Sequence, residues 1–210
     1  MQLVTLDFET YYDVGFSLSN LTTEEYIRDE RFQVIGVGIK INDGETSWFT
    51  GDQVREEFNR IDWKNSALLC HNTQFDGGIL AFRYGIVPSL YLDTLSMARA
   101  IHGTEVGGSL KVLAQHYELG EKGNEVHDMV GKRRIDITPA EMRAYGEYCK
   151  NDVVLTLGLF EKMVGYFPME ELRLIDLTIR MFSEPALRLD DEVLRDHLDD
   201  VRFKKLTLLS

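Results

Sequence analysis

The chain has few of the residues that mark secreted, zinc-binding or membrane proteins. Only two of its 210 residues are cysteine, Cys70 and Cys149, which speaks against a disulfide framework and indicates reduced thiols in a cytoplasm-like compartment. Its five histidines are scattered, with no Cys or His pair at zinc spacing. No apolar run approaches the roughly 20 residues of a membrane span, and the N-terminus lacks the regions of a secretory signal. We therefore expect a cytoplasmic protein without a membrane partner.

Positive charge is also scarce. Lys and Arg number 23 against 35 Asp and Glu, which gives a formal net charge of −12. Because proteins usually bind the nucleic-acid backbone through Lys and Arg, this balance lowers the expected affinity for nucleic acid. It does not exclude such a partner, since bound divalent cations would offset part of an acidic cluster. The binding expected is weak, salt-sensitive and dependent on metal.

Acidic residues gather in three short segments, and the first of these is VTLDFET at residues 4–10. Asp7 and Glu9 end an apolar run, and the period of two in a strand sends both side chains to one face. Two carboxylates on one face are a start for a site that holds Mg²⁺ or Mn²⁺, which prefer hard oxygen ligands.

The other two segments are HNTQFDGG at 71–78 and YCKND at 148–152. Asp76 follows a short apolar strand and opens a predicted helix. Tyr148 and Asp152 are four residues apart in a long helical pattern, so the phenol and the carboxylate lie on the same helix face. The three segments together supply four carboxylates and one phenol.

The order Asp-x-Glu, Asn-x-x-x-Asp and Tyr-x-x-x-Asp resembles the three exonuclease motifs of the DEDD superfamily, tyrosine subclass. The chain is similar in particular to the 3′-5′ proofreading domain of family A DNA polymerases of the phage type, from residue 1 to about 165. This resemblance implies an enzyme that removes 5′-mononucleotides from the 3′ end of single-stranded or frayed DNA. It also implies two divalent cations, Mg²⁺ or Mn²⁺, as cofactors.

The resemblance implies a role for each motif residue. Asp7 would bridge the two cations, Glu9 and Asp152 would hold the cation that carries the attacking water, and Asp76 would support the other. Tyr148 would orient that water, because a phenol with an ordinary pKa of about 10 is a poor base at neutral pH.

Other candidate residues are supported less strongly. Asn72 and Phe75 match family positions that contact the terminal nucleotide, although a turn residue and a core aromatic are equally good interpretations. Thr10 and Tyr11 follow the acidic strand and could meet the 3′ end, or could belong to a plain loop. The basic triplet 132–134 could contact phosphate, but a solvated surface run is the commoner meaning of such triplets.

The hydrophobic patterns predict an α/β protein. Residues 11–31 are expected to cross the edge of the site as a polar segment, and 120–136 to form a loop. Asp52, Asp93 and Ser109 are the expected helix caps. Strands are expected at 2–9, 33–41, 45–50 and 67–70, extended runs at 89–92 and 186–190, and helices at 52–61, 76–84, 94–101, from 109, at 139–163, at 170–182 and from 191.

This pattern agrees with the ribonuclease H-like (DnaQ-like) fold that the resemblance implies, with a mixed central sheet flanked by helices and a helical C-terminal extension. We expect an exonuclease domain at 1–168 and, at 169–210, an extension resembling the linker into a polymerase domain. The expected partners are a single-stranded DNA 3′ end and a polymerase domain of the same parent chain. The protein is expected to be a monomer, located in the host cytoplasm if its source is a virus.

Two other functions stay open. A ribonuclease D-like 3′-5′ exoribonuclease would use the same chemistry, and nothing in the motifs senses a 2′-hydroxyl. A catalytically silent nucleic-acid-binding module is less favoured, because silent relatives usually lose a metal-binding acid and all four acids are present here.

Overall fold

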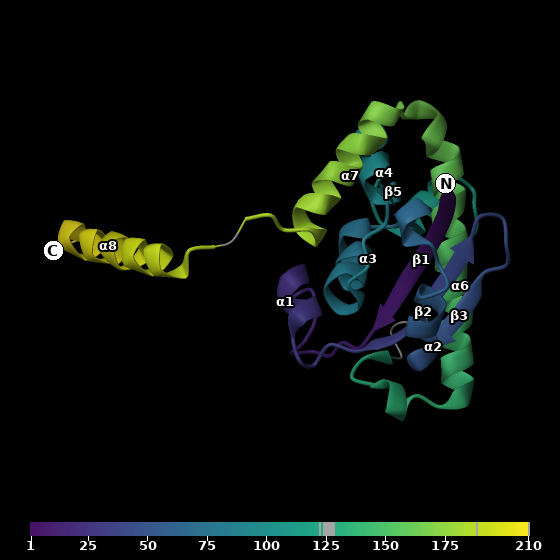
Figure 1. Ribbon diagram of the computed structural model, residues 1–210, viewed down its shortest axis with the longest axis horizontal. Helices are drawn as coiled ribbons and strands as arrows, with labels where there is room; N and C mark the ends of the chain where they lie inside the picture. The colour runs from purple at the N-terminus through teal and green to yellow at the C-terminus, as the bar shows by residue number, and fades with distance from the viewer. Residues whose placement is uncertain (122, 124–128, 188, 210) are drawn as a thin grey trace.

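The computed structural model describes residues 1–121, 123, 129–187 and 189–209. A five-stranded mixed sheet with the order β3-β2-β1-β4-β5 lies at its centre (Figure 1). β1 is antiparallel to β2 and parallel to β4, and this pairing places the first strand in the middle of the sheet. The strands are β1 (Gln2–Thr10), β2 (Val34–Ile41), β3 (Ser47–Thr50), β4 (Ser66–Cys70) and β5 (Leu90–Asp93).

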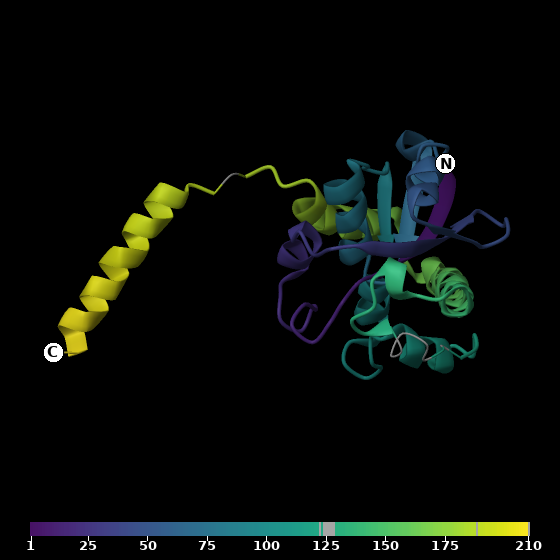
Figure 2. The ribbon, with the colours of Figure 1, turned by 90° about the horizontal axis from the view of Figure 1, so that it is seen from below.

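Helices cover both faces of the sheet, as Figure 2 shows. The long helix α6 packs on β1 to β4 on one face, where α4 and α5 lie against it, and α3 and α7 lie on the other face. The helices are α1 (Thr23–Arg28), α2 (Asp52–Phe58), α3 (Thr73–Ile79), α4 (Thr94–His102), α5 (Leu110–His116), α6 (Pro139–Met163), α7 (Met169–Ser183) and α8 (Asp191–Leu209), with one π-helical segment (Leu80–Tyr84) and 3-10 turns at Trp63–Asn65, Arg134–Asp136 and Val164–Tyr166.

Alternation along β1 divides the core in two. Leu6 and Phe8 point toward α2 and α3, where the ring of Phe8 meets Phe58 edge to face at 5.8 Å. On the α6 face, residues from α4, α5 and α6 form a second core with Leu69 of β4 and Leu92 of β5. Because β1 is central, its side chains are enclosed on both faces.

Most of the predicted elements are present. The hairpin around residues 42–44 joins β2 and β3, and α6 begins with Pro139 at its first position behind a Thr138 capping box. Asp93 and Ser109 cap α4 and α5, as predicted. The mixed α/β sheet predicted from the hydrophobic patterns is therefore confirmed.

Two local predictions were wrong, and a third, for the polar segment 11–31, missed a helix. The segment 11–31 contains α1, which begins behind a Thr22–Glu25 capping box. Asp52 is the first residue of α2, and Gly51 occupies the cap position without a side-chain bond. The helix predicted at 76–84 begins at Thr73, so Asp76 lies in its first turn. Parts of the predicted segments 120–136 and 186–190, namely 122, 124–128 and 188, lie outside the described residues.

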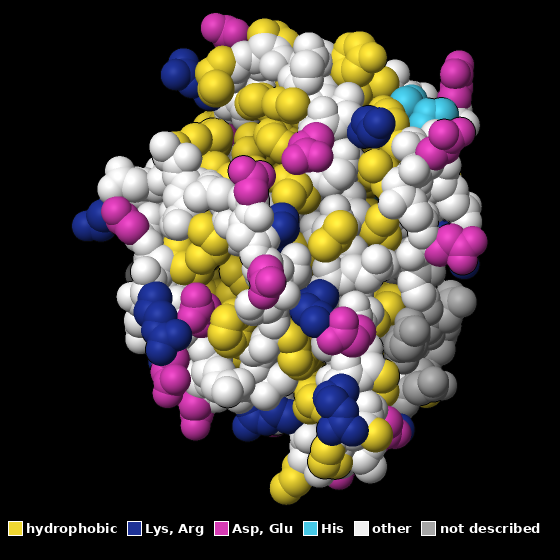
Figure 3. Space-filling model, turned by 90° about the vertical axis from the view of Figure 1, so that its right-hand side faces the viewer, with side chains coloured by type: hydrophobic (Ala, Val, Ile, Leu, Met, Phe, Trp, Pro, Cys, Tyr) yellow, Lys and Arg dark blue, Asp and Glu magenta, His cyan; other side chains and the backbone are white. Residues whose placement is uncertain are grey.

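The two last helices differ in how they contact the sheet. α7 packs on β5 and α3, with Leu172 and Ile179 in the core. α8 projects away from the rest of the molecule in Figure 1, and its side chains from Asp191 to Leu208 are all exposed. None of the described helices has the length and apolar character needed to cross a membrane. Acidic, basic and apolar side chains are interspersed on the face shown in Figure 3.

The close packing of α6 on β2 at Gly38 generates a stability prediction. A Cβ at residue 38 would lie 3.0 Å from Cys149 Sγ and 3.1 Å from Val153 Cγ2. Gly38→Val should therefore lower the free energy of unfolding by about 1–3 kcal/mol, the usual cost of overpacking. Urea unfolding followed by circular dichroism measures this change.

Gly165→Ala is the control, because a Cβ there would meet no described atom within 4 Å. Its effect should stay within about 0.5 kcal/mol. Equal stability of the two variants would contradict the tight contact between α6 and β2.

Candidate active site

Asp7 and Glu9 lie on the face of β1 that α6 covers. Both residues pair with glycines of the neighbouring strand β2: Asp7 pairs with Gly38, and Glu9 pairs with Gly36. The pairing shifts by one residue between Glu9 and Thr10. Such irregularities bend the end of a strand and re-aim its side chains. The two carboxylates therefore lie in the last regularly paired part of β1, with no bulky side chain opposite them on β2.

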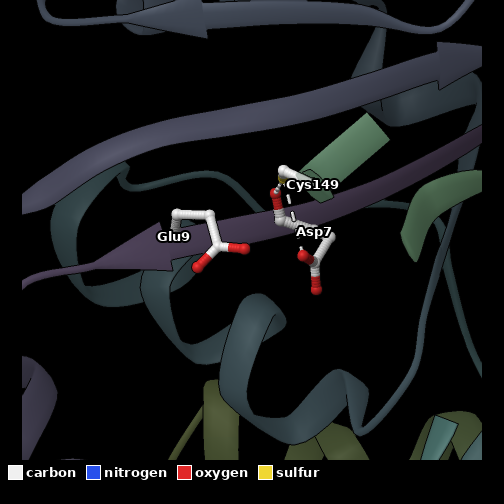
Figure 4. Close-up of side chains that lie close together, drawn as sticks. All are labelled: Asp7, Glu9 and Cys149. Carbon is white, nitrogen blue, oxygen red and sulfur yellow. Dashed lines mark hydrogen bonds between the residues drawn. The ribbon is translucent and has the colours of Figure 1, made fainter. Parts of the chain in front are cut away.

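α6 presents a stripe of side chains to these carboxylates. Tyr148, Cys149 and Asp152 are all buried on it, and their spacing places them on one helix face. The thiol of Cys149 lies 3.2 Å from the backbone oxygen of Asp7 and 3.5 Å from its Oδ2. Figure 4 shows Asp7, Glu9 and Cys149 together, and their potential ligand atoms lie within 4.8 Å of one another.

Asp76 approaches β1 from α3. β4 pairs with β1 only as far as Thr5, so the amide of Phe8 lies beyond the parallel ladder. Asp76 Oδ1 accepts a hydrogen bond from that amide at 3.0 Å, and the residue is 2% exposed. Burial and the charge of Asp7 raise the pKa of Asp76 well above its ordinary value. The helix thus brings a third carboxylate to the same point of β1.

The electrostatics show that the acids converge. Burial raises the pKa of the Tyr148 phenol, and the negative charges of Asp152, Glu9 and Asp7 raise it further. Burial also raises the pKa of the Cys149 thiol, together with the same three carboxylates. The charge of Asp7 also helps to raise the pKa of Asp76. All four predicted acids therefore lie within one small region. The structure therefore brings together the five residues of the three motifs.

The donor set suits a hard divalent cation. Four carboxylates supply oxygen ligands, which Mg²⁺ and Mn²⁺ prefer. The thiol of Cys149 is a soft donor, and its raised pKa keeps it protonated. Asp76 forms no ion pair with any described Lys or Arg, so its buried carboxylate faces only like charge among its charged neighbours. A cation at this point would relieve that repulsion.

The weaker candidate residues surround this cluster in different environments. Asn72 is exposed at the start of α3, in the left-handed conformation with φ 70°. Phe75 is half-buried, with its ring 6.1 Å from that of Tyr26. Thr10 Oγ1 lies 2.9 Å from the hydroxyl of Tyr26. Tyr11 is buried, and its hydroxyl donates to Asp13 Oδ2 at 2.5 Å.

A cavity of about 300 Å³ adjoins Glu9. Its lining includes Thr10, Tyr12 and Tyr26 from the end of β1 and the segment that follows, and Tyr145 from α6. Ser17 to Ser19 complete one side, so the segment 11–31 borders the space beside the acids. A cavity of this size can enclose a small polar group or part of a nucleotide.

The basic triplet belongs to the folded surface. Lys132 pairs with Glu141 at 2.6 Å, and the Arg133 guanidinium stacks 4.2 Å from the centre of the Tyr11 ring. The amide of Arg134 donates to Gln33 Oε1 at 3.0 Å. Two of the three cations are thus engaged by the protein itself.

Sequence reasoning missed two residues of the site. Cys149 was considered only as one of two reduced thiols, yet its thiol contacts Asp7. Tyr145 lines the cavity beside Glu9, and the charge of Glu9 adds to burial in raising its pKa. Both residues share the helix face of Tyr148 and Asp152, so the helical spacing could have found them.

Several solved structures are similar to this chain. The family B DNA polymerase of Pyrobaculum calidifontis is 16% identical with a TM-score of 0.61, over 87% of this chain and 27% of the polymerase chain. Brucella melitensis NrnC is 16% identical with a TM-score of 0.58, over 86% and 81% of the two chains. Trypanosoma brucei RNase D, in its GMP complex, is 14% identical with a TM-score of 0.66, over 90% and 60%.

These likenesses concern the fold. The mixed sheet flanked by helices is the ribonuclease H-like (DnaQ-like) fold, as predicted. The chain spans 27% of the length of the archaeal polymerase and 60% of the trypanosomal chain. No curated protein matches the sequence.

The sequence itself matches one family. The match extends over residues 30–165, most of the chain, and its description is 3′-5′ exonuclease. It includes Asp76, Tyr148 and Asp152, and it begins after Asp7 and Glu9 on β1. These two acids nevertheless lie beside the matched segment in the fold, because β1 is enclosed by β2, β4 and α6. The chain belongs to the 3′-5′ exonuclease family.

Proposed function

We propose that this protein is a metal-dependent 3′-5′ exodeoxyribonuclease of the DEDD superfamily, tyrosine subclass. It would cleave the terminal phosphodiester bond of single-stranded or frayed DNA and release 5′-mononucleotides. The observation that carries the proposal is the convergence of Asp7, Glu9 and Asp152 around the phenol of Tyr148, with Asp76 beside Asp7. A buried group of like charges has an electrostatic cost that a purely structural role would not explain.

Asp7, Glu9, Asp76 and Asp152 would hold two divalent cations, Mg²⁺ or Mn²⁺. The cations, when bound, supply Lewis-acid activation of water and stabilisation of the charge that develops on the leaving 3′-oxygen. The carboxylates fix where this chemistry takes place. Asp76 contributes from a position set by its bond to the Phe8 amide, and the Cys149 thiol keeps Asp7 in place.

Tyr148 would position the attacking water. Its ordinary pKa is about 10, and burial raises that value, so the phenol stays protonated and donates a hydrogen bond. Asn72, Phe75, Thr10 and Tyr11 are proposed to contact the terminal nucleotide. In support, Thr10 lines the cavity beside Glu9, and Asn72 is exposed at the start of the helix that carries Asp76.

The C-terminal part is proposed to lead into a polymerase domain, with 1–168 as the exonuclease domain and 169–210 as the linking extension. In support, α8 exposes Phe203 and Leu206, and exposed apolar side chains of this kind suit packing against another domain. In that arrangement the site would proofread the 3′ end of a phage-type polymerase. A monomer and a cytoplasmic location agree with this proposal.

The first test removes one carboxylate. Asp7→Ala should reduce the cleavage of a 5′-labelled single-stranded DNA by about a hundredfold or more, because the cations lose the ligand on the central strand. The products, resolved on a gel with Mg²⁺, Mn²⁺ or excess chelator, report polarity and metal dependence together. Chelator should abolish cleavage by the unmodified protein.

Asp43→Ala is the matched control, since Asp43 is an exposed acid in the β2–β3 turn. It should keep full activity. Full activity of Asp7→Ala, or cleavage that persists unchanged in chelator, would refute the assignment.

A second prediction concerns the phenol. Tyr148→Phe should lower the cleavage rate by about tenfold to a hundredfold while leaving substrate affinity nearly unchanged, because only the orientation of water is lost. Single-turnover kinetics separate the two quantities. Tyr166→Phe, at a tyrosine that is 74% exposed, is the control. A rate for Tyr148→Phe equal to that of the control would show that the hydroxyl takes no part.

The third prediction concerns the sugar. Matched DNA and RNA oligonucleotides of one sequence should be degraded at different rates, with DNA faster. The measurement is the initial rate of mononucleotide release with each metal. Faster release from RNA would assign the ribonuclease D-like function in place of the DNA-directed one, since the same acids serve both sugars.

A further inference from the structure

A second cavity is lined by residues of α2, of the π-helical segment and of the 3-10 turn before α6. Its volume is about 560 Å³, and it shares no lining residue with the cavity beside Glu9. Arg55, Arg83 and Arg134 contribute to its lining, with the rings of Phe32 and Tyr84. The cavity is within the usual size range for binding a small organic ligand, about 300–1,000 Å³.

The three arginines converge. Arg55 lies 5.1 Å above the ring centre of Tyr84, and Arg83 lies 4.9 Å above that of Phe32. Arg134 packs on the backbone of Gly51, where a Cβ would lie 2.7 Å from its Nη1. Burial raises the pKa of Tyr84, and the positive charges of all three arginines oppose that rise. Three guanidinium groups therefore act on one hydroxyl.

No carboxylate among the described residues forms an ion pair with these three guanidinium groups, although Arg83 donates to the backbone oxygen of Asp29 at 2.8 Å and its charge helps to lower the pKa of the Asp29 side chain. Asp52 and Glu56 also line the cavity, but neither lies within 4.0 Å of any of the three guanidinium groups. The Nε of Arg83 is buried without a hydrogen-bond partner in the described structure. In a chain with a net charge of −12, three arginines against two acids in the lining of one cavity give this place an excess of positive charge.

We propose that this cavity binds a phosphate group, carried by a free nucleotide or by the backbone of a nucleic-acid strand. Guanidinium groups match phosphate oxygens in pairs and keep their charge at any physiological pH. Stacking on Tyr84 and Phe32 holds two of them in place before a ligand arrives, so less side-chain freedom is lost on binding. The site is separate from the proposed catalytic centre.

The test compares two double variants of equal charge. Arg55→Gln/Arg134→Gln removes two cations from the cavity. Arg60→Gln/Lys64→Gln removes two exposed cations of the neighbouring segment that do not line it. Isothermal titration in excess chelator, which silences any cation-dependent binding, uses adenosine 5′-monophosphate, inorganic phosphate, adenosine and single-stranded oligothymidylate as probes. Circular dichroism checks that each variant is folded.

The cavity variant should raise the Kd of the phosphate-bearing probes by about tenfold or more, and the control variant by about twofold at most. An effect on oligothymidylate, with a salt dependence weakened by about two ions, would identify the nucleic-acid backbone as the source. An effect on the monophosphate or inorganic phosphate alone would identify a free nucleotide or ion.

Three results would overturn the proposal. They are equal losses in the two double variants, binding of adenosine as tight as that of its monophosphate, and no binding of any phosphate probe up to about 10 mM. Because the assay is run without metal ions and measures binding only, its outcome is independent of whether the nuclease assignment holds.

Discussion

The packing of β1, α3 and α6 must hold carboxylates of like charge together in one buried region. Each added charge raises the cost for the others: burial raises the pKa of Asp76, and the charge of Asp7 raises it further. The fold meets this cost with rigid packing. Gly38 lets α6 approach β2 so closely that Cys149 reaches both the backbone and the carboxylate of Asp7. If α6 lay further out, Asp152 and Tyr148 would no longer face β1.

Asp93 provides the same kind of constraint on the other wall of the site. It caps α4, as its position before the helix predicts, but it also accepts hydrogen bonds from the amides of Asn72 and Thr73 at 2.8 and 3.1 Å. One buried side chain thus fixes the start of α4 and the start of α3. Because Asp76 lies in the first turn of α3, its approach to Asp7 is determined two strands away, at the end of β5.

Local patterns could predict which residues of the candidate site share a strand or helix face, but not how deeply they are buried or what holds them. The period of two placed Asp7 and Glu9 on one face of β1, and the spacing of four did the same for Tyr148 and Asp152 on α6. Contacts between remote segments leave no periodic signal, so the bond from Cys149 to Asp7, across 142 residues, stayed hidden. The second role of Asp93 and the arginine cavity were missed for the same reason, and α1 was missed because its Thr22 capping box lies in a polar stretch.

The alternation of side chains along β1 also explains how a chain with a net charge of −12 could bind a nucleic-acid strand. These side chains alternate between two environments, with Asp7 and Glu9 toward α6 and Phe8 toward the other face. The Phe8 ring stacks on Tyr84 at 6.2 Å, and Tyr84 lies under the cluster of three arginines. The rings of Phe8 and Tyr84 therefore stand between β1 and the arginines, and salt screens interactions between exposed charges over about 8–10 Å. A strand held by phosphate contacts on the arginine side would need no positive charge near the acids, so the acidic cluster would remain free to bind cations.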